Sequence, residues 1–186
     1  HGALQTAGNL ERVGVTAFAV ATIDEGIALR KYGITGKILI LGYTSPYRAK
    51  ELKRWRLIQT IIDLNYAELL EAQNIKVSAH IKLDTGMHRL GIDAQNIQDI
   101  ERVYSMKHLN VCGIFTHLCC CDSLKPEDVD FTRKQISRFY SALSILESDG
   151  INQGKVHVQS SYGMLNYPEL KCDYVRAGIA LYGVRS

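Results

Sequence analysis

The chain has 186 residues, of which 46% are hydrophobic and 22% charged, as in an ordinary globular protein. This excludes a disordered or fibrous chain, and the length leaves room for one domain or most of a larger one. The formal net charge is only +3, with 22 basic and 19 acidic residues scattered along the chain. Composition therefore gives no indication of nucleic-acid binding.

The chain contains five cysteines, and Cys119, Cys120 and Cys121 are consecutive. This spacing is typical neither of a disulfide framework nor of a zinc site, because adjacent residues of an extended chain point to opposite faces. We interpret the three as packing residues in a reducing compartment, and expect no metal site and a cytoplasmic protein. No apolar run approaches the roughly 20 residues of a membrane-spanning helix.

Apolar, β-branched runs alternate with amphipathic stretches of helical length along the whole chain. After the first run, Thr22 and Glu25 stand at the spacing of a capping box, which predicts a helix that Gly33 ends. Pro126 suits the first turn of the longest helix, with Gly150 beyond its end. That helix is expected to bury Ile136, Phe139, Leu143 and Leu146. Further helices are predicted at 46–55, 66–73 and 94–106, and strands at 15–21, 37–42, 58–63, 77–83, 111–116, 156–158 and 174–181.

Seven strands joined by crossovers of helical length predict a parallel α/β fold. An eight-stranded (β/α) barrel that lacks one strand fits this count, and a doubly wound sheet is the alternative. The sequence contains neither GxGxxG nor GxxxxGK[ST], the phosphate-binding loops common in doubly wound sheets. We therefore favour the barrel, whose active site would lie at the carboxyl ends of the strands.

Polar residues follow four of the predicted strands. Lys82 lies inside an apolar strand and Arg89 follows a glycine turn, although a snorkelling lysine and a surface arginine would give the same pattern. His117 ends the next strand, where a lone histidine is more often a structural residue than a catalyst. Hydroxyls and a glycine follow His157 and suit an anion, with a plain capped turn as an equal alternative. Arg176 lies in an apolar run and needs an acceptor, because a buried unpaired guanidinium is costly.

In this order, the four clusters resemble the alanine racemase family, pyridoxal-phosphate enzymes with a (β/α)8 barrel followed by a β domain. The resemblance covers the whole chain. Several stretches are most similar to the racemase domain of the membrane-bound serine/alanine racemases of vancomycin-resistance clusters. The resemblance to the family rests on four motifs, KLDTGMHRLG, FTH, HVQSSYG and VRAGIALYG.

The resemblance implies a role for each matched side chain. Arg89 would contact the phenolic oxygen of the cofactor and the carboxylate of the substrate, and Lys82 would steady Arg89, as a carbamate in many members. His117 would lie against the pyridine ring. Arg176 would face the ring nitrogen with support from His157. Because arginine keeps its proton near neutral pH, such a site favours reprotonation of the α-carbon over decarboxylation or transamination.

The resemblance also implies a phosphate site formed by Ser161 with the backbone of Gly178 and Ile179. Ser160 is expected to contribute to the same site. It stands where many alanine racemases have asparagine, so this contact departs from the family pattern.

The family's Schiff-base lysine lies in a KANAYGHG-like motif, and this chain begins at the final HG of that motif. The second catalytic base is a tyrosine of the β domain of a partner subunit. We therefore expect residues 1–186 to be a barrel domain truncated at both ends, without the first strand and the carboxyl-terminal β domain, and inactive on its own.

The parent protein is expected to be a homodimer that interconverts L- and D-alanine or L- and D-serine for peptidoglycan. Membrane attachment, if any, would reside in a separate domain. The alternative hypothesis is a pyridoxal-phosphate-binding carrier or regulator that uses the same barrel without turnover.

Overall fold

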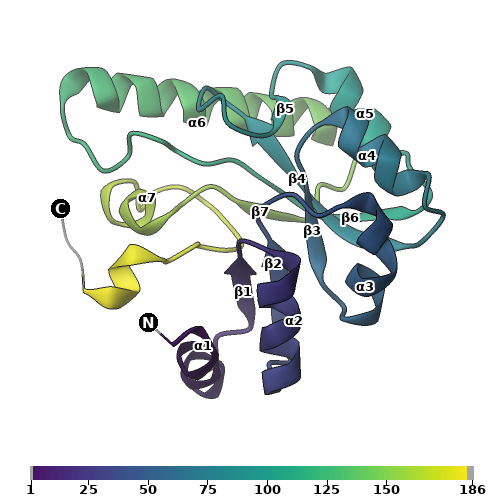
Figure 1. The fold of residues 1–186 in the computed structure, drawn as a ribbon. Helices are drawn as coiled ribbons and strands as arrows, with labels where there is room; N and C mark the ends of the chain where they lie inside the picture. The colour runs from purple at the N-terminus through teal and green to yellow at the C-terminus, as the bar shows by residue number, and fades with distance from the viewer. Residues whose placement is uncertain (1, 184–186) are drawn as a thin grey trace.

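The computed structural model describes residues 2–183 and contains one parallel sheet with helices packed against it (Figure 1). The first half of the chain forms α1 (Ala3–Arg12), β1 (Ala17–Val20), α2 (Ile23–Tyr32), β2 (Lys37–Ile40), η1 (Pro46–Arg48), α3 (Ala49–Arg54), β3 (Ile58–Ile61), α4 (Leu64–Glu71) and β4 (Val77–Asp84). The second half forms β5 (Ile92–Asp93), α5 (Ile97–Tyr104), β6 (Leu109–Phe115), α6 (Pro126–Ser148), β7 (Lys155–His157), α7 (Ser161–Asn166) and η2 (Ile179–Tyr182).

The order of the strands decides between the two predicted architectures. The hydrogen-bonded order is β1-β2-β3-β4-β6-β7, every pair is parallel, and the short β5 pairs only with the end of β4. A doubly wound sheet reverses its strand order at a switch point, whereas barrel strands follow the order of the chain. The described strands therefore form an arc of a (β/α) barrel, as predicted.

The two faces of the sheet have different cores. Along β2, Ile38 and Ile40 belong to the large hydrophobic cluster that the helices cover, while Leu39 points to the opposite face. On that face Leu39 packs with Ile58 and Phe115 in a small separate cluster. Residues of β2 are thus buried on both sides, which explains the continuous aliphatic run in the sequence.

The predicted helix signals are confirmed where local chemistry determines them. The Thr22 hydroxyl accepts from the Glu25 backbone N–H at 3.3 Å, and the Glu25 carboxylate accepts from the Thr22 N–H at 3.2 Å. Gly33 ends α2 with a φ of 108°, in the left-handed region that favours glycine. The predicted core face of α6 is also confirmed, with Phe139, Leu143 and Leu146 buried and Ile136 partly buried.

The strand predicted at 174–181 was wrong. Only an isolated parallel bridge between Ser160 and Arg176 forms there, and the run continues into η2. Val175 and Leu181 are 42% and 49% exposed, so this apolar run is not buried between layers as a central strand would be. The sequence analysis also missed α1, which lies beside the carboxyl-terminal segment in Figure 1. No helix among residues 2–183 is both long and apolar enough to cross a membrane.

Replacing Phe139 with alanine tests the core between α6 and the sheet. Phe139 is fully buried, so Phe139→Ala is expected to lower the free energy of unfolding by about 3–5 kcal/mol in urea titrations. Ile145 lies on the same helix with 43% exposure, so Ile145→Ala is the matched control and should cost less than about 1 kcal/mol. Equal losses for the two variants would contradict the assigned face of α6.

Candidate functional site

A pocket of about 320 Å³ lies where β4, β6 and the segment after β7 meet. It brings together residues that are far apart in the sequence, and most of the predicted site residues line it. His157 is the exception, since it lies behind Arg176. The predicted residues in the lining are Lys82, Arg89, His117, Ser160, Ser161, Arg176, Gly178 and Ile179.

Lys82 lies near the carboxyl end of β4 with its ammonium group almost fully enclosed. The residue is 6% exposed, and Nζ donates to the carbonyl oxygens of Leu83 at 2.8 Å and Leu90 at 3.4 Å. Burial, together with the positive charges of Arg176 and Arg89, lowers the pKa of Lys82 to about 8. About a tenth of Lys82 is therefore an uncharged amine at pH 7, and about half at pH 8.

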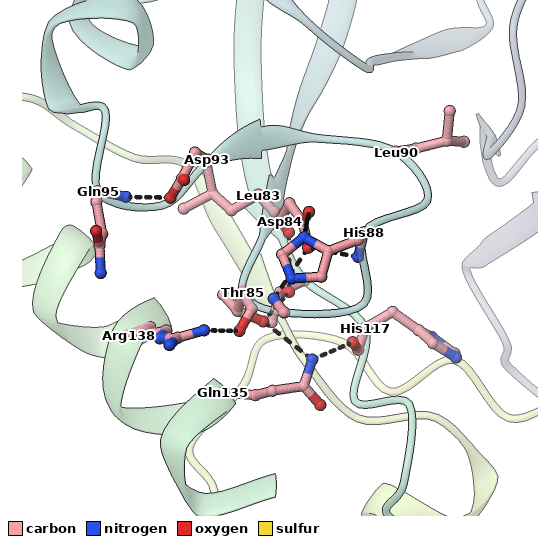
Figure 2. A network of polar contacts seen from close by, with 12 residues as sticks. Leu83, Asp84, Thr85, His88, Leu90, Asp93, Gln95, His117, Gln135 and Arg138 are labelled. Atoms are coloured by element: carbon pink, nitrogen blue, oxygen red, sulfur yellow. Dashed lines mark hydrogen bonds and ion pairs between the residues drawn. The ribbon is translucent and has the colours of Figure 1, made fainter. Parts of the chain in front are cut away.

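The loop that carries Arg89 is held by one carboxylate (Figure 2). Asp84 Oδ1 accepts from the backbone N–H of Gly86 at 2.9 Å and of His88 at 3.1 Å, and Oδ2 lies 3.0 Å from His88 Nδ1. Burial alone would raise the pKa of Asp84, but the two backbone hydrogen bonds and the positive charges of His88 and Lys82 together lower it. Arg89 itself is exposed at the mouth of the pocket.

Gly91 lets this loop return against the strand. Its φ is +120°, and a Cβ there would lie 2.7 Å from the backbone nitrogen of Asp84. Its N–H donates to the Ile62 carbonyl at 2.9 Å. Only glycine combines this conformation with so close an approach of two backbones.

His117 follows β6, and its backbone is tied to the Arg89 loop through α6 (Figure 2). Gln135 Nε2 donates to Thr85 Oγ1 and to the His117 carbonyl, each at 3.3 Å, while Oε1 accepts from the Cys119 N–H at 3.1 Å. Arg138 donates to the Thr85 carbonyl at 3.1 Å. Burial and nearby positive charges lower the pKa of His117 to about 4, so its ring is neutral at neutral pH.

Arg176 is bonded to the ends of two neighbouring strands. Nη1 lies 2.6 Å from His157 Nδ1, and Nη2 donates to the carbonyl oxygens of Thr116 at 2.7 Å and Val158 at 3.0 Å. These contacts use three of the five N–H groups of a guanidinium. Burial lowers the pKa of Arg176 to about 10, which still leaves it charged at neutral pH. Within the described part of the chain its acceptors are a histidine and two backbone carbonyls, and no carboxylate is among them.

Phe115 forms the floor beneath these groups, a role that the sequence analysis missed. Its ring stacks on His157 with centroids 4.6 Å apart and planes 9° from parallel. The Arg176 guanidinium lies 5.1 Å and the Lys82 ammonium 5.9 Å from the ring centroid, within the range of cation–π attraction. Its place directly before Thr116 and His117 was the only sequence signal available.

The segment after β7 supplies convergent polar groups. The Ser161 hydroxyl is buried and accepts from the backbone N–H groups of Gly178 at 3.0 Å and Ala180 at 3.2 Å. Ser160 Oγ lies 3.6 Å from Cys121 Sγ. Space is open around the Gly178 Cα, because an added Cβ would meet nothing within 4 Å.

The charges of the pocket are one-sided. Among the described residues that line it, Lys82, Arg89 and Arg176 are basic and none is acidic. Hydroxyls and backbone N–H groups complete the polar lining. Such a site suits a ligand with more than one anionic group.

A second cavity of about 720 Å³ lies on the other side of Arg176, between α1, β1 and residues 174–182. Its lining is mostly apolar and includes His80 and His157. Because most of the predicted site residues line the smaller pocket, we place the functional site there.

Comparison with known proteins agrees with this geometry. The family model described as "Alanine racemase, N-terminal domain" matches residues 1–186. The chain is 51% identical over 184 residues to an amino-acid racemase of Enterococcus faecalis and 46% identical over 182 residues to a serine/alanine racemase of Enterococcus gallinarum. These alignments cover 99% and 98% of the chain, but only 26% of each relative.

A solved structure shares the fold. The alanine racemase of Clostridium difficile 630 superposes with a TM-score of 0.89 at 32% identity, covering 98% of this chain and 48% of that one. The barrel architecture is therefore confirmed. Together with the family match along all 186 residues, these similarities show that the chain belongs to the alanine racemase family.

Proposed function

We propose that this chain is a barrel domain of a longer pyridoxal-phosphate-dependent racemase acting on alanine or serine. The observation that carries the proposal is the pocket with three basic side chains, two serine hydroxyls and no carboxylate among the described lining residues. The Enterococcus relatives are an amino-acid racemase and a serine/alanine racemase, and the chain spans about a quarter of their length.

The residues of the pocket fit the cofactor. The Ser161 hydroxyl already gathers two backbone N–H groups, and the open space at Gly178 admits a phosphate beside them. We assign the phosphate to Ser160, Ser161 and the backbone of Gly178 and Ile179.

The aromatic ring of the cofactor is assigned to the opposite part of the pocket. Arg176 would hold the ring nitrogen and His117 would lie against the ring; in support, both side chains line the pocket and His157 contacts Arg176 from behind.

Pyridoxal phosphate supplies an electron-withdrawing system that makes the α-proton of a bound amino acid acidic. Arg176 keeps its own proton, because even after burial its pKa is about 10. It therefore donates a hydrogen bond to its ligand and does not transfer a proton. Arg89 is exposed at the pocket mouth and is placed to bind the carboxylate of the amino acid.

The groups that remove and return the α-proton are proposed to lie outside these 186 residues. The resemblance assigns them to a lysine and to a tyrosine of a partner subunit, which makes the parent protein a homodimer. The five cysteines are free thiols, which supports a cytoplasmic location.

Exchange of the α-proton tests the activity. The full-length parent protein, loaded with pyridoxal phosphate in D2O, is expected to incorporate deuterium into L-alanine or L-serine and to release the D-enantiomer. Deuterium incorporation is measured by NMR, and the D-enantiomer is measured by chiral chromatography. Binding of the cofactor through a reducible lysine adduct without any exchange would instead favour the carrier or regulator.

Ser161 tests the phosphate site. Ser161→Ala is expected to weaken binding of pyridoxal phosphate by about tenfold or more in calorimetric titrations, because a hydrogen bond to a charged group is lost. Binding of pyridoxal, which lacks the phosphate, should change little. Ser144 is exposed on α6, and Ser144→Ala provides the control. If Ser161→Ala weakened the binding of pyridoxal phosphate and of pyridoxal equally, the phosphate would not be bound by Ser161.

Lys82 is proposed to react with carbon dioxide. Its uncharged nitrogen bonds to the carbon of CO2 and releases a proton, which gives a carbamate anion able to pair with Arg89. At fixed dissolved ¹³CO2, the carbamate NMR signal should grow as pH rises from 7 to 9, since the free amine appears as pH passes the Lys82 pKa of about 8.

Two lysine variants identify the reacting residue. Lys82→Arg should abolish the carbamate signal, while Lys155→Arg should retain it because Lys155 is paired with Asp173 and its pKa is raised. A signal that persists in Lys82→Arg would refute the assignment.

A further inference from the structure

A line of hydrogen bonds continues behind Arg176, away from the pocket. His157 Nδ1 lies 2.6 Å from Arg176 Nη1, and His157 Nε2 lies 2.9 Å from His80 Nδ1. The two histidines are 1% and 3% exposed. They stand on β7 and β4, which are separated by β6.

A glycine in the middle strand makes this contact possible. Gly113 of β6 is paired with His80 on one side and with Lys155 on the other. A Cβ on Gly113 would lie 2.6 Å from both Cε1 and Nε2 of the His80 ring. The missing side chain therefore leaves a notch through which His80 reaches across β6 to His157.

The donors and acceptors along this line fix both tautomers. A guanidinium can only donate, so His157 Nδ1 must present a lone pair to Arg176. Burial and the charge of Arg176 lower the pKa of His157 to about 2, so its ring is neutral and carries its proton on Nε2. That N–H donates to His80 Nδ1, which must also present a lone pair.

His80 is neutral for similar reasons. Burial and the positive charges of Lys37 and Arg176 lower the pKa of His80 to about 4. Its single proton therefore resides on Nε2, and Nδ1 remains an acceptor. Rotation of the His157 ring would turn an N–H or a C–H toward the guanidinium, and His80 resists this rotation from behind.

We propose that His80 is a positioning residue for Arg176, because it holds the His157 ring with its lone pair toward the guanidinium. Arg176 is thereby kept aimed into the pocket with its remaining N–H groups directed to the ligand. The inference rests on the proposed function, in which the ligand of Arg176 is the ring nitrogen of pyridoxal phosphate.

Two substitutions separate an acceptor role from mere packing. Asparagine can place its Oδ1 near the position of the His80 Nδ1 and accept the same hydrogen bond, whereas leucine fills the space without an acceptor. The ring nitrogens of His157 are read by long-range ¹H–¹⁵N correlation spectra of the chain without cofactor. These spectra show directly which nitrogen carries the proton.

The native chain and His80→Asn are expected to show one sharp His157 species protonated at Nε2. His80→Leu should show broadened or doubled His157 signals and faster exchange of the Arg176 N–H protons. In the full-length parent protein, pyridoxal phosphate should bind His80→Leu about tenfold more weakly than the native form, and His80→Asn nearly as tightly.

Other results would decide against the inference or against its premise. A proton on His157 Nδ1 in the native chain, or native spectra in His80→Leu, would overturn the positioning role. Spectra as expected, with no binding of pyridoxal phosphate to any form of the full-length parent protein, would support the positioning of Arg176 and overturn the proposed ligand.

Discussion

The arrangement of the site depends on the need of one buried guanidinium for acceptors. Arg176 lies in a segment whose neighbours Val175 and Leu181 are largely exposed, so hydrophobic burial does little to hold it. Its bonds to His157 and to the carbonyls of Thr116 and Val158 attach the segment to the ends of β6 and β7. A buried charge without partners is costly, so the segment is stable only where Arg176 reaches these three acceptors.

The pocket lowers the pKa values of three of its nitrogen-containing side chains, mainly because they are buried there before any anion is bound. Burial lowers the pKa of Arg176, and burial together with neighbouring positive charges lowers the pKa values of Lys82 and His117. Phe115 offsets part of this cost with the electron-rich face of its ring. An anionic ligand would relieve the remainder, so binding and protonation in this pocket are thermodynamically linked.

The sequence predicted those features that local chemistry determines. The capping box at Thr22 and the buried face around Phe139 follow from spacing alone. The run at 174–181 was misread because a short apolar stretch gives the same pattern in a strand and in a loop packed over a site. The helix α1 was missed because its sequence is polar on average and contains Gly8.

The site was predicted through family motifs and not through periodicity, and the structure shows what those motifs could not. Gln135 and His80 are buried polar residues whose partners lie 50 and 77 positions away. Such pairings arise from tertiary structure, so no local signal marks them. The phosphate and ring assignments remain proposals that the described geometry supports.

Gln135 also affects how the site opens. Its one amide group binds both the loop after β4 and the loop after β6, and it is fully buried. If either loop moved away, a buried amide group of Gln135 would lose a hydrogen-bond partner, which costs about 1–3 kcal/mol. A displacement of either loop is therefore coupled to the other through Gln135 of α6.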